Sequence, residues 1–174
     1  MPKQLKIIPE RCIGCKSCEL ACSLATSDEL NQSKSRITMM TFVEGKYPLS
    51  YNVPLTCKQC ADAPCLRSCP VSAISRLRNE MKTVVVDHES CVKCGKCVAA
   101  CPFGAMLFDS ETRKPFKCEL CGGQPACASI CPTTAIVFGP QRPFYSKGQA
   151  LQMEGFAILS QRHKESVRPS KSGK

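Results

Sequence analysis

Hydrophobic positions along the chain come in short runs, and polar or turn-forming residues interrupt them at close intervals. The runs typical of strands are LKII (5–8), YNVPL (51–55), ISRLR (74–78), KTVVVD (82–87), MLFD (106–109), RKPFK (113–117) and AIVF (135–138). The runs 74–78 and 82–87 are separated by residues 79–81, which include Asn79-Glu80, and the runs 106–109 and 113–117 are separated by Ser110-Glu111-Thr112. Both short connections predict hairpins. The pattern predicts an α+β fold of short elements.

Two segments depart from this pattern. Residues 23–50 are rich in Ser, Thr and Asn and are interpreted as an insertion with a helical start. After a loop-like stretch at 139–145, the sequence GQALQMEGFAILSQ (148–161) predicts a short amphipathic helix or a docking segment. The final stretch, 162–174, is polar and basic, a composition typical of a disordered tail.

The cysteine content is high and leaves few residues for an aliphatic core. Sixteen of the 174 residues are cysteines, and the hydrophobic fraction of 43% includes them, so the aliphatic core is small. Disulfides are disfavoured because closely spaced cysteines in a tight loop are poorly placed to bridge each other. The start, MPKQLKIIPE, lacks the apolar segment of a secretory signal, and no run is long enough for a membrane anchor. A cytoplasmic protein whose thiols bind metal is expected.

The cysteines fall in four groups that form an internal repeat. The groups are CIGCKSCELAC (Cys12, Cys15, Cys18, Cys22), CKQCADAPCLRSCP (Cys57, Cys60, Cys65, Cys69), CVKCGKCVAACP (Cys91, Cys94, Cys97, Cys101) and CELCGGQPACASICP (Cys118, Cys121, Cys127, Cys131). The last three groups continue with a proline, whereas the first has Ser23 at that position. No cysteine is left over.

The spacing within each group is typical of iron–sulfur ligation. Three closely spaced cysteines surround one cubane cluster, and the fourth reaches a neighbouring cluster. Helices of one or two turns are expected after each fourth cysteine or across the three residues before it, and a following proline suits a first turn. Zinc ribbons instead use two C-x2-C pairs, with two ligands in each. The three-plus-one unit therefore predicts four [4Fe-4S] clusters, with all sixteen cysteines as iron ligands.

The formal charge of +10 would ordinarily favour nucleic acid as a partner. That sum treats the thiols as neutral, and four oxidised clusters with their thiolates would add about −8. The sequence also lacks an aromatic-and-basic recognition motif. Nucleic-acid binding is therefore not expected.

The four motifs resemble those of the four-cluster ferredoxin-type electron-transfer subunits found in dimethyl sulfoxide reductase, formate dehydrogenase and hydrogenase complexes. The resemblance covers residues 5–138 and implies two nested ferredoxin-like units within 1–138. The outer unit would combine about 1–30 with 112–138, so that LKII and AIVF meet as edge strands, and the inner unit would span about 50–111. The extension 139–174 is expected to dock a partner.

In that family the motifs are paired across the chain, which the spacing alone does not establish. Carried over residue by residue, the resemblance implies four ligand sets, named here site I (Cys12, Cys15, Cys18, Cys131), site II (Cys118, Cys121, Cys127, Cys22), site III (Cys57, Cys60, Cys65, Cys101) and site IV (Cys91, Cys94, Cys97, Cys69). The clusters would follow one another in this order along a line.

The resemblance also implies a role for the protein. It would be a non-catalytic subunit that passes electrons between a larger tungsten- or molybdenum-containing catalytic subunit and a flavin subunit or soluble ferredoxin. Its length and lack of an anchor are most similar to the small iron–sulfur subunit of bacterial tungsten aldehyde oxidoreductase. The alternatives are a formate dehydrogenase or hydrogenase subunit, a free polyferredoxin, or a cluster-containing maturation protein. Head-to-tail self-stacking is a further alternative.

Overall fold

The computed structural model describes residues 3–44, 49–140 and 147–166. Within these ranges, strands pair two by two in separate antiparallel sheets. The strands are β1 (Lys3–Ile7), β2 (Ile37–Glu44), β3 (Leu49–Thr56), β4 (Ile74–Arg76), β5 (Val84–Val86), β6 (Leu107–Phe108), β7 (Pro115–Phe116) and β8 (Ile136–Pro140). The helices are α1 (Ser17–Ser27), α2 (Pro64–Arg67), α3 (Lys96–Ala100), α4 (Ala126–Ser129) and α5 (Lys147–Ser166), with 3-10 turns η1 (Pro9–Arg11), η2 (Gln32–Lys34) and η3 (Leu120–Gly123). The mixed fold of short strand pairs agrees with the sequence pattern.

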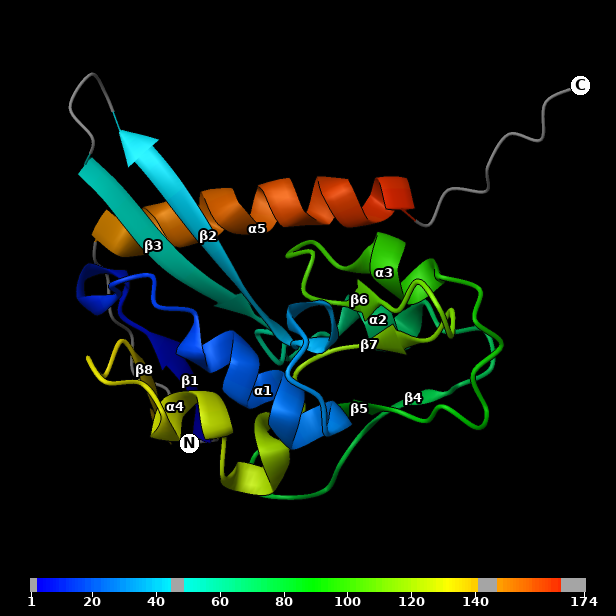
Figure 1. Ribbon diagram of the computed structural model, residues 1–174. Coiled ribbons are helices and arrows are strands. Elements are labelled where there is room, and N and C mark those ends of the chain that lie inside the picture. The colour runs from blue at the N-terminus through cyan, green and yellow to red at the C-terminus, as the bar shows by residue number, and fades with distance from the viewer. Residues whose placement is uncertain (1–2, 45–48, 141–146, 167–174) are drawn as a thin grey trace, which may run out of the picture.

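The first and last strands of the cysteine-rich region form one sheet. β1 runs antiparallel to β8, with Leu5 opposite Phe138 and Ile7 opposite Ile136. Ile7 and Ile136 are buried in a core that also contains cysteines of α1 and α4, beside which the sheet lies (Figure 1). The expectation that LKII and AIVF meet is thereby confirmed.

Both expected hairpins are present. β4 pairs with β5, and β6 pairs with β7, as the two short polar connections indicated. Ile74, Val84 and Val86 of the first hairpin pack with Val98 of α3 and with Met106 in a second buried cluster. These hairpins occupy the side of the molecule opposite the β1–β8 sheet (Figure 1).

Segment 23–50 contains more structure than its composition indicated. Its helical start is confirmed, because α1 continues to Ser27, but the segment also supplies β2, which pairs with β3 along its full length. The Glu19 carboxylate of α1 accepts a hydrogen bond from the backbone N–H of Met39 over 2.5 Å. This bond fixes the helix against the strand that follows it.

In the last three motifs the short helix lies before the fourth cysteine rather than after it, whereas α1 contains the fourth cysteine of the first motif, Cys22. Behind the fourth cysteines, Pro70, Pro102 and Pro132 begin turns. Ser72 and Gly104, each two residues further on, have φ angles of 54° and 57°, a left-handed conformation that ends a right-handed turn. The alternative in which the helix spans the three residues before the fourth cysteine is therefore the correct one for α2, α3 and α4.

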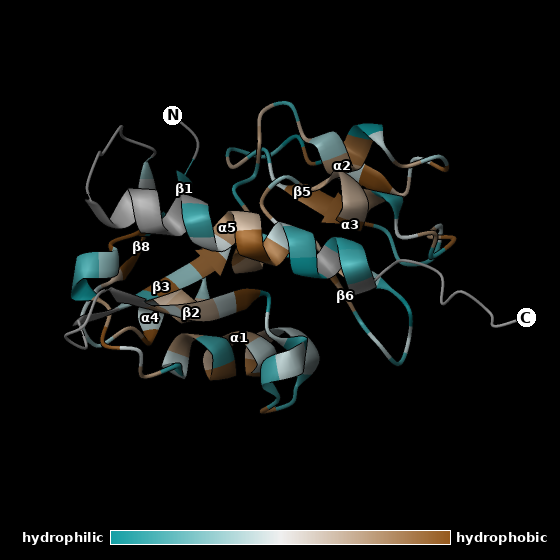
Figure 2. Cartoon of the chain, turned by 90° about the horizontal axis from the view of Figure 1, so that it is seen from above, coloured by the Kyte–Doolittle hydropathy of each residue, from teal (hydrophilic) through white to brown (hydrophobic). Residues whose placement is uncertain are grey.

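The C-terminal helix α5 is longer than expected and packs on the rest of the molecule. Phe156 and Leu159 are 1% and 3% exposed, and they contact Val53 and Leu55 of β3. Phe156 also meets the ring of Phe103 edge-on, with centroids 5.2 Å apart. Figures 1 and 2 show α5 crossing over β3 towards α3, with hydrophobic residues midway along it. Partner docking by the extension stays a prediction, and residues 141–146 and 167–174 lie outside the described part.

Candidate iron–sulfur cluster sites

The sixteen cysteines line four cavities. The lining cysteines are Cys12, Cys15, Cys18 and Cys131 in one cavity, Cys22, Cys118, Cys121 and Cys127 in the next, Cys57, Cys60, Cys65 and Cys101 in the third, and Cys69, Cys91, Cys94 and Cys97 in the fourth. Each cavity takes three cysteines from one motif and the last from another. The structure thus brings together the same four sets as sites I to IV.

Local backbone geometry turns three cysteines of a motif towards one cavity. Lys16, Ala63 and Gly95 stand directly before α1, α2 and α3 with φ angles of 59°, 36° and 71°. Only glycine adopts this conformation without strain, so two residues with side chains are held there against their preference. Each turn reverses the direction of the backbone just before the helix that carries the third cysteine of its motif.

The fourth cysteine of a motif is separated from the third by one helical turn. On α1, Cys18 lines site I, whereas Cys22 lines site II and accepts a hydrogen bond from the backbone N–H of Arg36 over 3.3 Å. Sulfur atoms four residues apart on a helix lie about 6 Å from each other along the axis. A single helix therefore supplies ligands to two adjacent cavities.

Burial makes the thiols unfavourable places for negative charge. It raises the pKa of Cys18, Cys57 and Cys97 to about 12, and it raises the pKa of Cys127 as well. Neighbouring cysteines in the same cavity add to the rise. Four crowded thiols need a bound cation to become thiolates together, and iron in a cluster supplies that charge. The donor set fits soft, thiolate-ligated [4Fe-4S] clusters.

The pKa of Cys131 is shifted in the opposite direction to the pKa values of Cys12 and Cys18, which burial raises. Burial raises its pKa, but hydrogen bonds from the backbone N–H of Ile136 and from the Thr133 hydroxyl outweigh this, so its pKa is lowered. Hydrogen bonds to a ligand sulfur disperse its negative charge. These hydrogen bonds therefore favour the thiolate form of Cys131 within site I.

A buried polar network joins sites II and III, and the sequence analysis did not predict it. Gln59, 4% exposed, donates to the carbonyl oxygen of Cys118 over 2.8 Å and accepts from the backbone N–H of Val84 over 3.0 Å. Lys117 Nζ donates to the same two residues, to Val84 O and over 2.9 Å to Cys118 O. Gln59 and Lys117 both line site III. Their positions inside or beside cysteine motifs were the only signal in the sequence.

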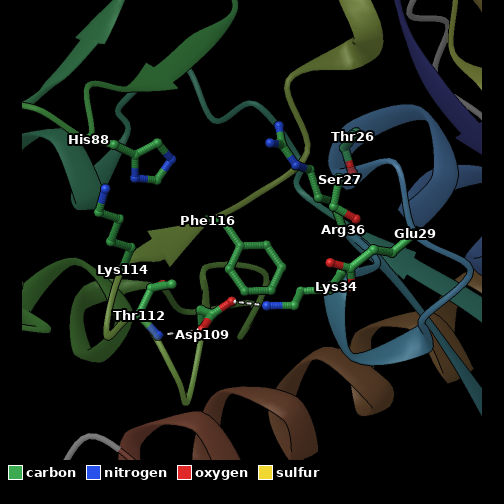
Figure 3. A pocket seen from close by; sticks show the side chains of 10 residues that line it. All are labelled: Thr26, Ser27, Glu29, Lys34, Arg36, His88, Asp109, Thr112, Lys114 and Phe116. Carbon is green, nitrogen blue, oxygen red and sulfur yellow. Dashed lines mark hydrogen bonds and ion pairs between the residues drawn. The ribbon is translucent and has the colours of Figure 1, made fainter.

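A further cavity of about 280 Å³ lies outside the cysteine sites (Figure 3). It is lined by residues of α1, η2 and the β6–β7 hairpin, and the Lys34 ammonium pairs across it with Asp109 over 2.7 Å. Among the described residues no cysteine lines it, and no three His, Cys, Asp or Glu side chains converge as they would around a single metal ion. The Lys34–Asp109 ion pair joins η2 to the β6–β7 hairpin.

Comparison with known proteins agrees with this arrangement. The family described as a 4Fe-4S dicluster domain matches residues 49–141, and that described as a 4Fe-4S binding domain matches residues 5–23. The polyferredoxin-like subunit of the aliphatic sulfonate oxidoreductase of Pyrococcus furiosus is 38% identical over 144 residues, which cover 80% of each sequence. The chain thus belongs to the family of non-catalytic 4Fe-4S ferredoxin-type electron-transfer subunits.

Other members of this family are similar over comparable lengths. The thiosulfate reductase electron transfer subunit PhsB of Salmonella typhi is 34% identical over 139 residues, which cover 75% of this chain and 71% of the relative. The electron transport protein HydN of Escherichia coli K12 is 34% identical over 148 residues, which cover 73% of this chain and 82% of the relative. The family matches and the sixteen cysteines are consistent with four [4Fe-4S] clusters. Over the described ranges, no helix has the length and hydrophobicity needed to cross a membrane.

Proposed function

We propose that this electron-transfer subunit carries its four clusters in a line, with sites I to IV as their ligand sets. The observation that carries the proposal is the composition of the cavities, in which three cysteines of one motif meet one cysteine of another. When bound, the clusters supply one-electron redox chemistry. The protein holds them, excludes water from their inner faces and fixes their order.

The order follows from the elements that adjacent sites share. α1 carries ligands of sites I and II, and the segment Cys127–Cys131 carries ligands of the same two sites. The segments Cys65–Cys69 and Cys97–Cys101 connect sites III and IV in the same way. Sites II and III share no helix, and the bonds of Gln59 and Lys117 to Cys118 connect them instead. These links support a line in which the sites follow in the order I, II, III, IV.

The same links support two nested ferredoxin-like units within 1–138. The outer unit, from about 1–30 and 112–138, holds sites I and II and is joined by the β1–β8 sheet. The inner unit, from about 50–111, holds sites III and IV and contains the β4–β5 hairpin. Residues 139–174 form the extension, whose helix α5 lies over β3; its outer surface serves as the partner-docking face.

The partner is a larger catalytic subunit containing tungsten or molybdenum, as in an aldehyde oxidoreductase, and the other end of the line serves a flavin subunit or soluble ferredoxin. Relatives named as subunits of a sulfonate oxidoreductase and a thiosulfate reductase support a place in an oxidoreductase complex. Cys15 of site I and Cys94 of site IV are exposed, as is Cys121 of site II, so both ends of the line approach the surface. HydN, named only as an electron transport protein, favours a free carrier as the second candidate.

The cluster content tests the first part of the proposal. Protein prepared without oxygen should contain about sixteen iron and sixteen sulfide per chain, and reductive titration should show four one-electron steps. Serine in place of one cysteine at a time should remove about a quarter of the iron. Zinc in place of iron, or two clusters rather than four in the wild-type protein, would contradict the proposal.

Purification of the native complex tests the proposed partnership with a larger catalytic subunit. Size-exclusion chromatography of the protein purified from its own cells should show co-elution with a larger subunit, and elemental analysis should find tungsten or molybdenum in that fraction. A monomer with four intact clusters would favour the free carrier.

A further inference from the structure

One cation beside the cluster sites differs from all the others in its burial. Lys117 is 1% exposed and is among the largest fully buried side chains of the described residues. It directly precedes Cys118 of site II, and its side chain lines the site III cavity with the four cysteines of that site. A single ammonium group therefore lies at the junction of two cluster sites.

The partners of Lys117 leave its charge uncompensated by protein anions. Nζ donates to Val84 O and to Cys118 O, and a carbonyl oxygen carries no net charge. Across the described part of the molecule, no carboxylate lies within ion-pair distance of Lys117. An isolated buried charge is costly, and anionic thiolates and clusters are the compensation that this location offers.

Most other basic residues of the motifs are poorly placed for the same task. Lys58 is partly buried, but its Nζ lies over the Phe156 ring, 4.9 Å from the centroid, and Lys58 is not part of the site III lining. Lys16, Lys93 and Lys96 are exposed, and Arg67 forms an exposed ion pair with Asp62 over 2.7 Å. Water and salt screen such charges within about 8–10 Å at ordinary ionic strength. A charge enclosed by protein is screened far less, so Lys117 acts on its neighbours much more strongly.

The geometry also ranks the two sites. The Lys117 side chain lines the site III cavity together with Cys57 and Cys65, whereas it reaches site II through its hydrogen bond of 2.9 Å to the carbonyl oxygen of Cys118. The ammonium is therefore placed to act on site III first and on site II second.

We propose that Lys117 is a potential-setting residue, whose buried positive charge raises the midpoint potential of the site III cluster and, less strongly, that of site II. The proposal rests on the proposed function, since it presupposes clusters at these sites. Reduction adds one electron to a cluster and makes or breaks no bond, so the reduced form is the more negative one. A nearby fixed positive charge favours that form, and cluster potentials follow their local charge.

The test compares three variants with wild type in the anaerobic, cluster-loaded protein. Lys117→Met removes the charge and keeps an unbranched side chain that is one heavy atom shorter. Lys117→Arg keeps the charge. Arg67→Met is the matched control, because Arg67 lies in α2, two residues after Cys65 of site III, but is exposed and paired. Iron content is measured first, and each variant is then titrated with dithionite and followed by electron paramagnetic resonance.

We expect Lys117→Met to retain four clusters and to shift one reductive step to lower potential. At a fixed potential, the reduced-to-oxidised ratio of that cluster should fall about tenfold, which is about 59 mV for a one-electron couple. Lys117→Arg and Arg67→Met should titrate like wild type. If the substitution acted through packing alone, the midpoint potential would shift as far in Lys117→Arg as in Lys117→Met. That result would overturn the proposal.

The other outcomes are equally decisive. Four unchanged steps in Lys117→Met overturn the role of Lys117 but leave the four-cluster carrier intact. Loss of clusters from Lys117→Met, with full content in Lys117→Arg, would show that the charge serves cluster assembly instead, and it also overturns the proposal. A wild-type protein without four clusters would contradict the proposed function itself.

Discussion

The side-chain amide of Gln59 donates a hydrogen bond over 2.8 Å to the carbonyl oxygen of Cys118, a residue 59 positions further along the sequence. Gln59 belongs to the motif that lines site III, and Cys118 lines site II. The same amide accepts from the backbone N–H of Val84 on β5. One buried side chain therefore connects the middle two sites through three segments that are distant in sequence.

Gln59→Leu should destabilise the protein by about 1–3 kcal/mol, because it leaves the buried N–H of Val84 without an acceptor. Chemical unfolding of the cluster-loaded protein measures the difference. Gln161→Leu is the control, since Gln161 is exposed on α5 and should change the unfolding free energy little. Equal effects of the two substitutions would show that the Gln59 bonds contribute nothing.

Gly104→Ala should loosen the docking of α5. Gly104 has φ 57°, and a Cβ atom there would lie 2.2 Å from the backbone nitrogen of Ser160. Gly122 has a similar φ of 63° but open space around it, so Gly122→Ala measures the backbone strain alone. We expect Gly104→Ala to cost about 1–3 kcal/mol more than Gly122→Ala. The readouts are the unfolding free energy and the rate of proteolysis within α5; similar values for both variants would contradict the close contact.

Cys22→Ser should damage the cluster of site II and leave that of site I, although Cys22 belongs to the first motif. Cys131→Ser is the reciprocal variant and should damage site I, although Cys131 belongs to the fourth motif. Each variant should lose about a quarter of the iron, and serine substitutions at Cys12 and Cys118 identify the spectroscopic signal of each site. Loss of the site I signal alone in Cys22→Ser would refute the cross-pairing.

Asp109→Asn should lower stability at neutral pH and lose its effect in acid. The hydrogen bond from Lys34, followed by that from the Thr112 backbone, holds the pKa of Asp109 well below its ordinary value. A carboxyl group whose pKa is lower in the folded than in the unfolded protein stabilises the folded state at pH values above its unfolded pKa, which is about 3.9 for Asp. This contribution declines as the pH falls below that value. Urea unfolding from neutral pH to about pH 3.5 should show the difference from wild type shrinking.

The control for this pH dependence is Asp62→Asn. The Asp62–Arg67 pair has side chains that are 65% and 63% exposed, so its loss should change stability little at any pH. A constant difference between Asp109→Asn and wild type over the whole range would refute the role of the Lys34 pair.

The hairpins and the four cysteine motifs follow from local features that the sequence displays. Short connections between strand-like runs predicted the β4–β5 and β6–β7 pairs, and the structure contains both. β2 was missed because its sequence ITMMTFVE follows a polar stretch, and its residues Ile37 and Met39 pack in a core with Ile136, which is distant in sequence. Strand preference depends on such contacts more than on the residues themselves. The length of α5 was underestimated for the same reason, since its buried face is defined by β3.

The sequence by itself determined the chemistry: sixteen cysteines in three-plus-one groups are complete ligand sets for four cubane clusters. The spacing did not choose among the pairings of the motifs, because ligand spacing constrains neighbours and not distant segments. Tertiary structure decided which cysteines share a cavity, through the β1–β8 sheet and the two ligand-bearing turns of α1. It also decided that one of several basic residues beside the motifs, Lys117, is enclosed by protein, since burial depends on packing that no local pattern encodes.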